Sequence, residues 1–175
     1  MSSAFHMRTK AFTLIELAVV LLVIGVLSGI VLRNVGSQGI QARDVKRVSD
    51  LRNVSVYLAQ YASKGGQFPT ANDLTWSATS PLSIALQAAG IITAGLLPTK
   101  PPSGSGSYLY YACSDQGAPP TAVVNHYILK VVLEEKTTEN PQIWEGGATF
   151  PAGWNCGTPA PSCDQATGKE YCLVN

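Results

Sequence analysis

One carboxylate stands inside a long apolar segment near the N-terminus. Residues 12–32 form a run of 21 residues in which Glu16 carries the single charge. An ionised carboxylate at membrane depth costs about 2.5–3.5 kcal/mol on insertion scales, so it needs a cationic partner. No basic residue lies within one helical turn of Glu16, since Lys10 is six positions away. A suitable partner is the α-amino group that a cut before Phe12 would create, supplied by a neighbouring copy of the chain.

The apolar segment has the length of a membrane span. About 20 apolar residues cross the hydrocarbon core of a bilayer as a helix, whereas a secretory signal has a core of only 7–15 residues. Arg8 and Lys10 precede the segment, as expected of an N-terminus that stays in the cytoplasm. The plainer alternative is an ordinary membrane anchor whose Glu16 lies near the lipid head groups.

Four cysteines form the second chemically distinctive set, and none of them forms a C-x-x-C pair: Cys113, Cys156, Cys163 and Cys172. Such cysteines form disulfides in an exported domain, and are free thiols or metal ligands in a cytosolic one. The N-terminal segment favours export, so we expect two disulfides in one of three connectivities. We favour the two that attach the C-terminal tail, residues 146–175, to the strands expected before it. These are Cys113–Cys156 with Cys163–Cys172, and Cys113–Cys172 with Cys156–Cys163.

No set of catalytic residues is evident. The two histidines are His6, which precedes the apolar segment, and His126, which begins an expected strand. The motifs of serine hydrolases, zinc proteases and phosphate-binding loops are missing from the sequence. We therefore expect no enzymatic activity, no cofactor and no metal, and the net charge of +1 does not point to nucleic acid.

Helices are expected to position these residues. Beyond Leu32, apolar residues recur at spacings of three and four from Val45 to Tyr61, which predicts an amphipathic helix that ends at Gly65-Gly66. The charged residues of segment 33–52 are interpreted as a solvated face that pairs with acids on neighbouring copies, with anionic lipid or DNA as the alternative. Ser80 and Pro81 predict the N-cap and first position of a short second helix.

Strands are expected in the second half of the chain. Residues 108–113 and 126–134 are rich in aromatic and β-branched side chains, and a turn-rich segment between them favours antiparallel pairing. A two-stranded hairpin is marginally stable by itself. A third strand is therefore expected at 142–144 or at 171–174.

The sequence K-A-F-T-L-I-E-L around the start of the apolar segment resembles the cleavage and methylation signature of type IV pilins and type II secretion pseudopilins. The resemblance implies that a prepilin peptidase cuts between Ala11 and Phe12 and methylates the Phe12 amine. It also implies that Phe12 and Glu16 dock one subunit onto the next. The sequence departs from the family in two respects, because Ala11 stands where Gly is usual and the mid-helix Pro of many pilins is missing.

The resemblance implies an α+β protein: a long N-terminal helix, transmembrane in its first half, and a pilin-like head with a small antiparallel sheet and a disulfide-linked C-terminal loop. The expected parts are a leader (1–11), a transmembrane and assembly helix (12–32), its amphipathic continuation (33–64) and a globular head (65–175). The precursor would lie in the inner membrane with its head outside the cytoplasm, and later in an extracellular or periplasmic filament.

The expected function is that of a structural subunit of a type IV pilus or a type II secretion pseudopilus. The partners implied are other subunits, the prepilin peptidase, the inner-membrane assembly platform and membrane lipid. The first alternative is a minor tip subunit that binds DNA or a surface ligand. The second is a membrane-anchored enzyme or inhibitor, for which Glu16 would have no role in assembly.

Overall fold

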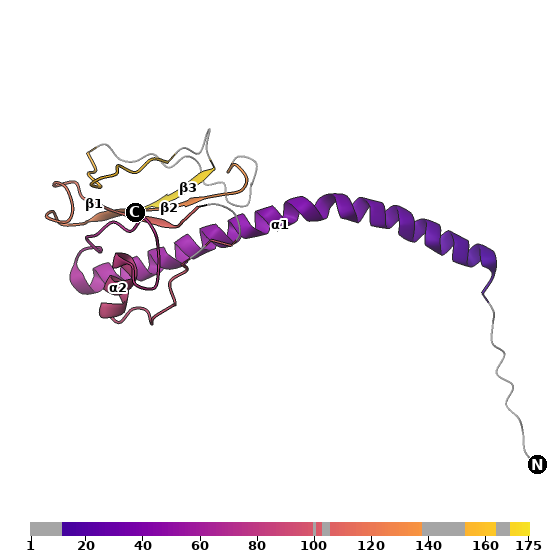
Figure 1. Cartoon of the computed structure of the whole chain (residues 1–175), viewed down its shortest axis with the longest axis horizontal. Helices are drawn as coiled ribbons and strands as arrows, with labels where there is room; N and C mark the ends of the chain where they lie inside the picture. The colour runs from indigo at the N-terminus through magenta and orange to yellow at the C-terminus, as the bar shows by residue number, and fades with distance from the viewer. Residues whose placement is uncertain (1–11, 100, 103–105, 138–152, 164–168) are drawn as a thin grey trace, which may run out of the picture. The chain divides into compact units, whose positions relative to one another are not determined.

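The fold is α+β, with two helices and a three-stranded sheet among the residues described. The computed structural model describes residues 12–99, 101–102, 106–137, 153–163 and 169–175. The helices are α1 (Leu14–Gly65) and α2 (Pro81–Ala88), and the strands are β1 (Leu109–Cys113), β2 (His126–Val132) and β3 (Glu170–Val174) (Figure 1). Two compact units are distinguished by their internal contacts, Met1–Gly39 and Ile40–Asn175. The expected amphipathic continuation from residue 40 onward thus belongs to the same unit as the head.

The C-terminal half of α1 forms the core of the head through its apolar stripe. Val48, Leu51, Val54 and Leu58 are at most 2% exposed, at the spacing that the sequence predicts. They pack with the aromatic and aliphatic side chains of one face of the sheet, among them Tyr110, Tyr127, Leu129, Val131 and Tyr171. Gly66 ends the helix with a φ of 72°, and its N–H donates to the Ala62 carbonyl at 2.7 Å.

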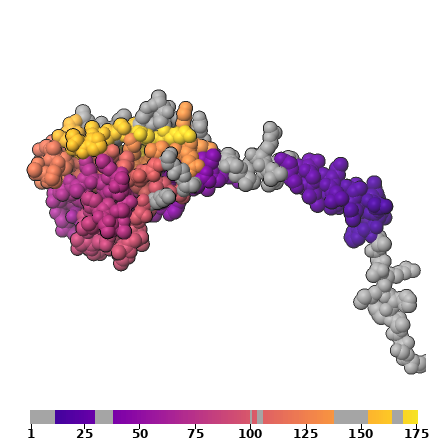
Figure 2. All heavy atoms as spheres, viewed as in Figure 1, coloured from indigo at the N-terminus to yellow at the C-terminus, as the bar shows by residue number. Residues whose placement is uncertain are grey.

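The sheet is antiparallel, with strand order β1-β2-β3. The predicted strand pair is confirmed, and the third strand lies at the second of its two expected positions; residues 142–144 lie outside the described residues. The face opposite α1 carries Tyr111, Cys113, Ile128 and Cys172, which cluster with Cys156. The C-terminal residues 153–163 therefore cover this face, as the yellow segments of Figures 1 and 2 show.

Helix α2 begins where expected, but a different residue caps it. Ser80 and Pro81 occupy the N-cap and first positions, yet the Ser80 hydroxyl makes no capping bond and donates instead to the Ser77 carbonyl at 3.1 Å. The Asp73 carboxylate, 2% exposed, accepts the Leu82 N–H at 3.2 Å and the Thr75 N–H at 3.3 Å. The carboxylate thus supplies the acceptor that the sequence assigns to Ser80.

Replacing Asp73 with Ala should lower the free energy of unfolding by about 1–2 kcal/mol, because the buried Leu82 N–H and the partly buried Thr75 N–H lose their acceptor. The matched change Ser80→Ala should cost less than about 0.5 kcal/mol, since its hydroxyl does not cap the helix. Urea unfolding of the full chain in mild detergent, followed by tryptophan fluorescence, measures both. Equal losses for the two variants would contradict this assignment of the cap.

Candidate processing and assembly site

A capping box formed by Thr13 and Glu16 starts helix α1. The Thr13 N–H and hydroxyl donate to Glu16 Oε2 at 3.0 and 2.8 Å, and the Glu16 N–H donates to Thr13 Oγ1 at 3.4 Å. A threonine followed three positions later by a glutamate satisfies the N–H groups at a helix start in this reciprocal way. The Glu16 carboxylate therefore has local partners within its own helix.

The T-x-x-E spacing could have revealed this cap from the sequence. A cation is the partner that a carboxylate in an apolar segment suggests, but the Glu16 carboxylate accepts from the hydrogen-bond donors of Thr13, three positions away. The Thr13 cap and a cation are different kinds of partner for Glu16. The cap satisfies hydrogen bonds but leaves the carboxylate with its full charge. A pairing with an amine thus remains chemically open to it.

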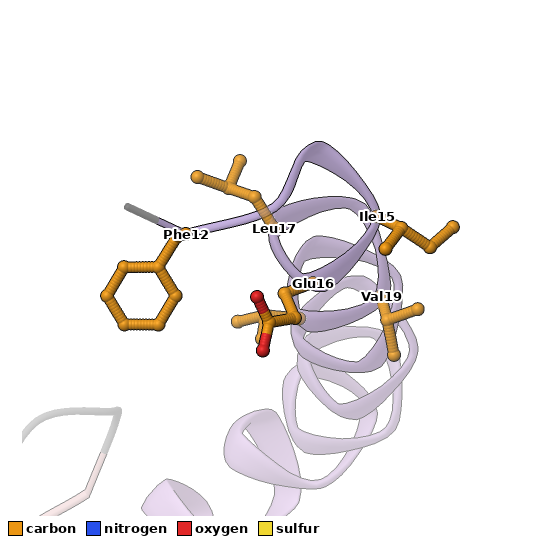
Figure 3. A pocket seen from close by; sticks show the side chains of 6 residues that line it. Phe12, Ile15, Glu16, Leu17 and Val19 are labelled. Atoms are coloured by element: carbon orange, nitrogen blue, oxygen red, sulfur yellow. The ribbon is translucent and has the colours of Figure 1, made fainter. Parts of the chain in front are cut away.

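The first turns of α1, as far as Leu27, expose apolar side chains. Phe12 is 86% exposed and precedes the helix, and Figure 3 shows Ile15 and Val19 on the same side of its first turns. Among residues 12–29, the other large apolar side chains are exposed as well: Leu14, Leu17, Val20, Leu21, Leu22, Val23, Ile24, Val26 and Leu27. Exposed apolar surface of this extent marks contact with lipid or with a protein partner.

The membrane span is not confirmed by the structure. Within the described residues, no helix is long and apolar enough to cross a membrane. The transmembrane role of residues 12–32 therefore stays a prediction. Ala11, the residue before the expected cut, lies outside the described residues, so the processing site is described from Phe12 onward.

Asp44, Arg47 and Asp50 are buried and paired within the chain, which corrects their interpretation as part of a solvated face. Lys46, in the same segment, is 62% exposed. The group formed by Arg43, Asp44, Arg47 and Glu134 is called here the charged clamp. Arg47 is 1% exposed and donates to Asp44 Oδ1 and to Glu134 Oε1, both at 2.7 Å. A further bond of 2.9 Å runs from Arg47 Nη2 to the Pro102 carbonyl.

The acidic members of the clamp hold α1 to the segment after β2. Asp44 is fully buried and accepts the N–H groups of Glu134 and Glu135 at 2.9 and 3.0 Å. Arg43 binds Glu134 with two nitrogens, one of them Nε at 2.8 Å. These hydrogen bonds and the Arg47 charge hold the pKa of Glu134 below its ordinary value of 4.5. The carboxylates thus fix the head to the helix that carries it.

A second buried contact lies one turn along α1. Asp50 is 5% exposed, accepts the Tyr108 hydroxyl at 2.6 Å and pairs with Lys46 at 2.6 Å. Burial and the hydrogen bond to Asp50 raise the pKa of the Tyr108 hydroxyl. The tyrosine therefore remains neutral and serves as a hydrogen-bond donor to the helix.

Both predicted disulfides are present, and the structure selects one connectivity. Cys113 is bonded to Cys156, and Cys163 is bonded to Cys172. This is one of the two favoured connectivities, and no cysteine is free. The bonds attach the tail to β1 and β3, so the covering of the outer face is covalently linked to the sheet.

The described residues include no group of three or more His, Cys, Asp or Glu side chains arranged to hold a metal ion. His126 stacks on Trp154 with ring centroids 4.0 Å apart, a packing contact between β2 and the tail.

Comparison with known protein families gives a match at the N-terminus. Residues 6–32 match the family described as the prokaryotic N-terminal methylation motif. Comparisons with curated proteins and with solved structures found no match. This chain therefore carries, over residues 6–32, the motif that defines the prepilin-like proteins of the type IV pilin and pseudopilin family.

Proposed function

We propose that this chain is a structural subunit of a type IV pilus or a type II secretion pseudopilus. It is made as a precursor in the inner membrane and is cut by a prepilin peptidase between Ala11 and Phe12. The observation that carries the proposal is the methylation motif over residues 6–32, which includes the start of α1 and its exposed apolar side chains from Leu14 to Leu27. A subunit of a filament needs such a surface, because copies of it must cover one another.

Assembly depends on a charge pair at the N-terminal end of this surface. Cutting leaves a positively charged α-amino group on Phe12, four residues before the Glu16 carboxylate. In a staggered stack, the amine of one subunit pairs with Glu16 of the next, which neutralises both charges in apolar surroundings. The apolar side chains of α1 pass from lipid into contact with neighbouring subunits, so van der Waals packing between helices, rather than removal from water, holds the copies together.

The charged clamp and the apolar stripe attach the head to α1, so the head enters the filament together with the helix. It therefore contributes the outer surface of the filament. A tip subunit that binds DNA is the alternative, and it has less support because Arg43 and Arg47 are engaged by Glu134 within the chain. DNA binding requires basic side chains that are available to phosphates.

Mass spectrometry of the chain co-expressed with a prepilin peptidase tests the proposal. We expect a product that begins at N-methylated Phe12, and an uncut chain when the peptidase is inactivated. Ala11→Gly restores the residue usual in the family and should be cut at least as fast as the natural chain. An intact N-terminus with active peptidase, or a cut beyond residue 32, would overturn the proposed function.

A further inference from the structure

A lysine is buried under the C-terminal tail, on the sheet face that is turned away from α1. Lys130 lies in β2 and is 6% exposed. Its neighbours in the strand, Leu129 and Val131, contribute to the core on the α1 side, so alternation directs Lys130 to the opposite face. A buried ammonium group must be paired and hydrogen-bonded to be tolerated.

The partners of Lys130 lie at both ends of the loop that the second disulfide closes. Its Nζ donates to the Ser162 carbonyl at 2.6 Å and lies 3.3 Å from Ser162 Oγ, one residue before Cys163. It also pairs with Glu170 Oε1 at 2.7 Å, two residues before Cys172. In the register of the sheet, Lys130 stands directly opposite Cys172. One ammonium group therefore joins the two segments that contain Cys163 and Cys172.

Chain statistics alone do not explain why Cys163 pairs with Cys172. Cys156 and Cys163 are seven residues apart, and Cys163 and Cys172 are nine apart. Loop-closure entropy changes only slowly with loop length, so the two closures are almost equally probable in an unfolded chain. A contact that acts before the sulfur–sulfur bond forms must favour one of them.

We propose that Lys130 selects the disulfide connectivity by holding the Cys163 and Cys172 segments together before they are oxidised. Contacts that bring two thiols together raise the effective concentration of one for the other. The remaining pair has its own contacts, because Ser114 and Asn155, next to Cys113 and Cys156, exchange backbone hydrogen bonds of 2.8 and 2.9 Å. Each disulfide thus forms at a place where non-covalent contacts already join its two segments.

Lys130 acts as a positioning residue in the second step of oxidation by glutathione disulfide. In the first step, one cysteine thiolate attacks glutathione disulfide, forms a mixed disulfide and releases one glutathione thiolate. In the second, the other cysteine thiolate attacks the cysteine sulfur of the mixed disulfide and releases the second glutathione. Two thiols lose two electrons in total, one glutathione disulfide gains them, and the two protons end on the released glutathione.

Disulfide mapping in the full chain tests the proposal. The reduced chain in mild detergent is equilibrated in glutathione buffers, quenched by alkylation and analysed by peptide mass spectrometry. Lys130→Met should lower the effective concentration of the Cys163–Cys172 pair about tenfold or more, and should increase the Cys156–Cys163 product. The Cys113–Cys156 pair, once formed, should change less than about threefold.

Two further variants distinguish the loss of the Lys130 ion pair from a general loss of folded structure. Ser162→Ala retains the backbone acceptor and should leave both effective concentrations almost unchanged. Glu170→Gln retains the shape of the side chain but removes its charge, and should weaken the Cys163–Cys172 pair selectively. An unchanged Cys163–Cys172 pair in Lys130→Met, or an equal loss of both pairs in Glu170→Gln, would overturn the proposal.

Discussion

Replacing Glu16 with Leu should abolish filament assembly while the precursor is still cut and the head still folds. The change removes the single carboxylate of residues 12–32 and leaves the Phe12 amine of the docking subunit without a counter-charge. An unpaired charge at this depth costs about 2.5–3.5 kcal/mol, which corresponds to a reduction in filament of about a hundredfold. Filaments sheared from cells and quantified by immunoblot, relative to the total subunit, measure the effect.

Two matched variants distinguish the charge of Glu16 from its cap. Glu16→Gln retains an oxygen that can accept from Thr13 but has no charge, so it should fail to assemble as Glu16→Leu does. Thr13→Ala removes the side-chain half of the cap and retains the carboxylate; it should assemble, at a cost of about 1 kcal/mol in helix stability. Normal filaments from Glu16→Leu would show that assembly does not depend on Glu16 as a counter-charge.

Local patterns predicted the elements of the fold correctly. The three- and four-residue spacing of Val48, Leu51, Val54 and Leu58 indicated a helix with one buried stripe, and these side chains are the part of α1 in the core. Aromatic and β-branched residues indicated the strands, and the need for more than a hairpin predicted the third. Such patterns can be recognised from the sequence because each depends on residues close together in the chain.

Contacts between distant segments were not predictable in the same way. Glu134 lies 90 residues after Asp44, so nothing local shows that its backbone N–H meets a carboxylate on α1. The charged residues of segment 33–52 were expected to be exposed because of their types, since charged residues are rarely buried unless they are paired. Asp73 likewise caps α2 from outside the capping motif at Ser80-Pro81.

The candidate site likewise has features that the sequence identifies and features that only the structure shows. The motif from Lys10 to Leu17 and the four cysteines were identified from residue type and spacing. The choice between the two favoured disulfide connectivities needed the structure, because it depends on which segments the folded chain brings beside Cys113 and Cys172, and the sheet register places Lys130 opposite Cys172. A strand register is set by the whole sheet, so spacing along the chain cannot decide it.

Replacing Arg47 with Met should lower the free energy of unfolding by about 3–5 kcal/mol. The change leaves Asp44, which is fully buried, without its cation, and removes one of the two arginines that bind Glu134. Removing one partner of a buried pair is costly because the other charge remains buried and unpaired. Urea unfolding of the full chain in mild detergent measures the loss.

Lys46→Met is the control for Arg47→Met, since it removes a cation one residue away that is 62% exposed. It should cost less than about 1 kcal/mol, because exposed ion pairs contribute little and Asp50 retains its bond from Tyr108. Equal losses for the two variants would show that burial of the clamp does not determine its contribution.

The dependence of the free energy of unfolding on pH tests whether the arginines of the charged clamp stabilise the ionised Glu134 carboxylate. The pKa of Glu134 is lower in the folded chain than its ordinary value of 4.5, so its contribution is complete above that value and is lost as the pH falls through the folded pKa. The natural chain should therefore lose stability below about pH 4.5, and Glu134→Gln should lose less over the same range. Because Arg43 contributes most to this lowering, Arg43→Met should also reduce the pH dependence. A pH profile unaltered by both variants would show that Glu134 is not held by the arginines of α1.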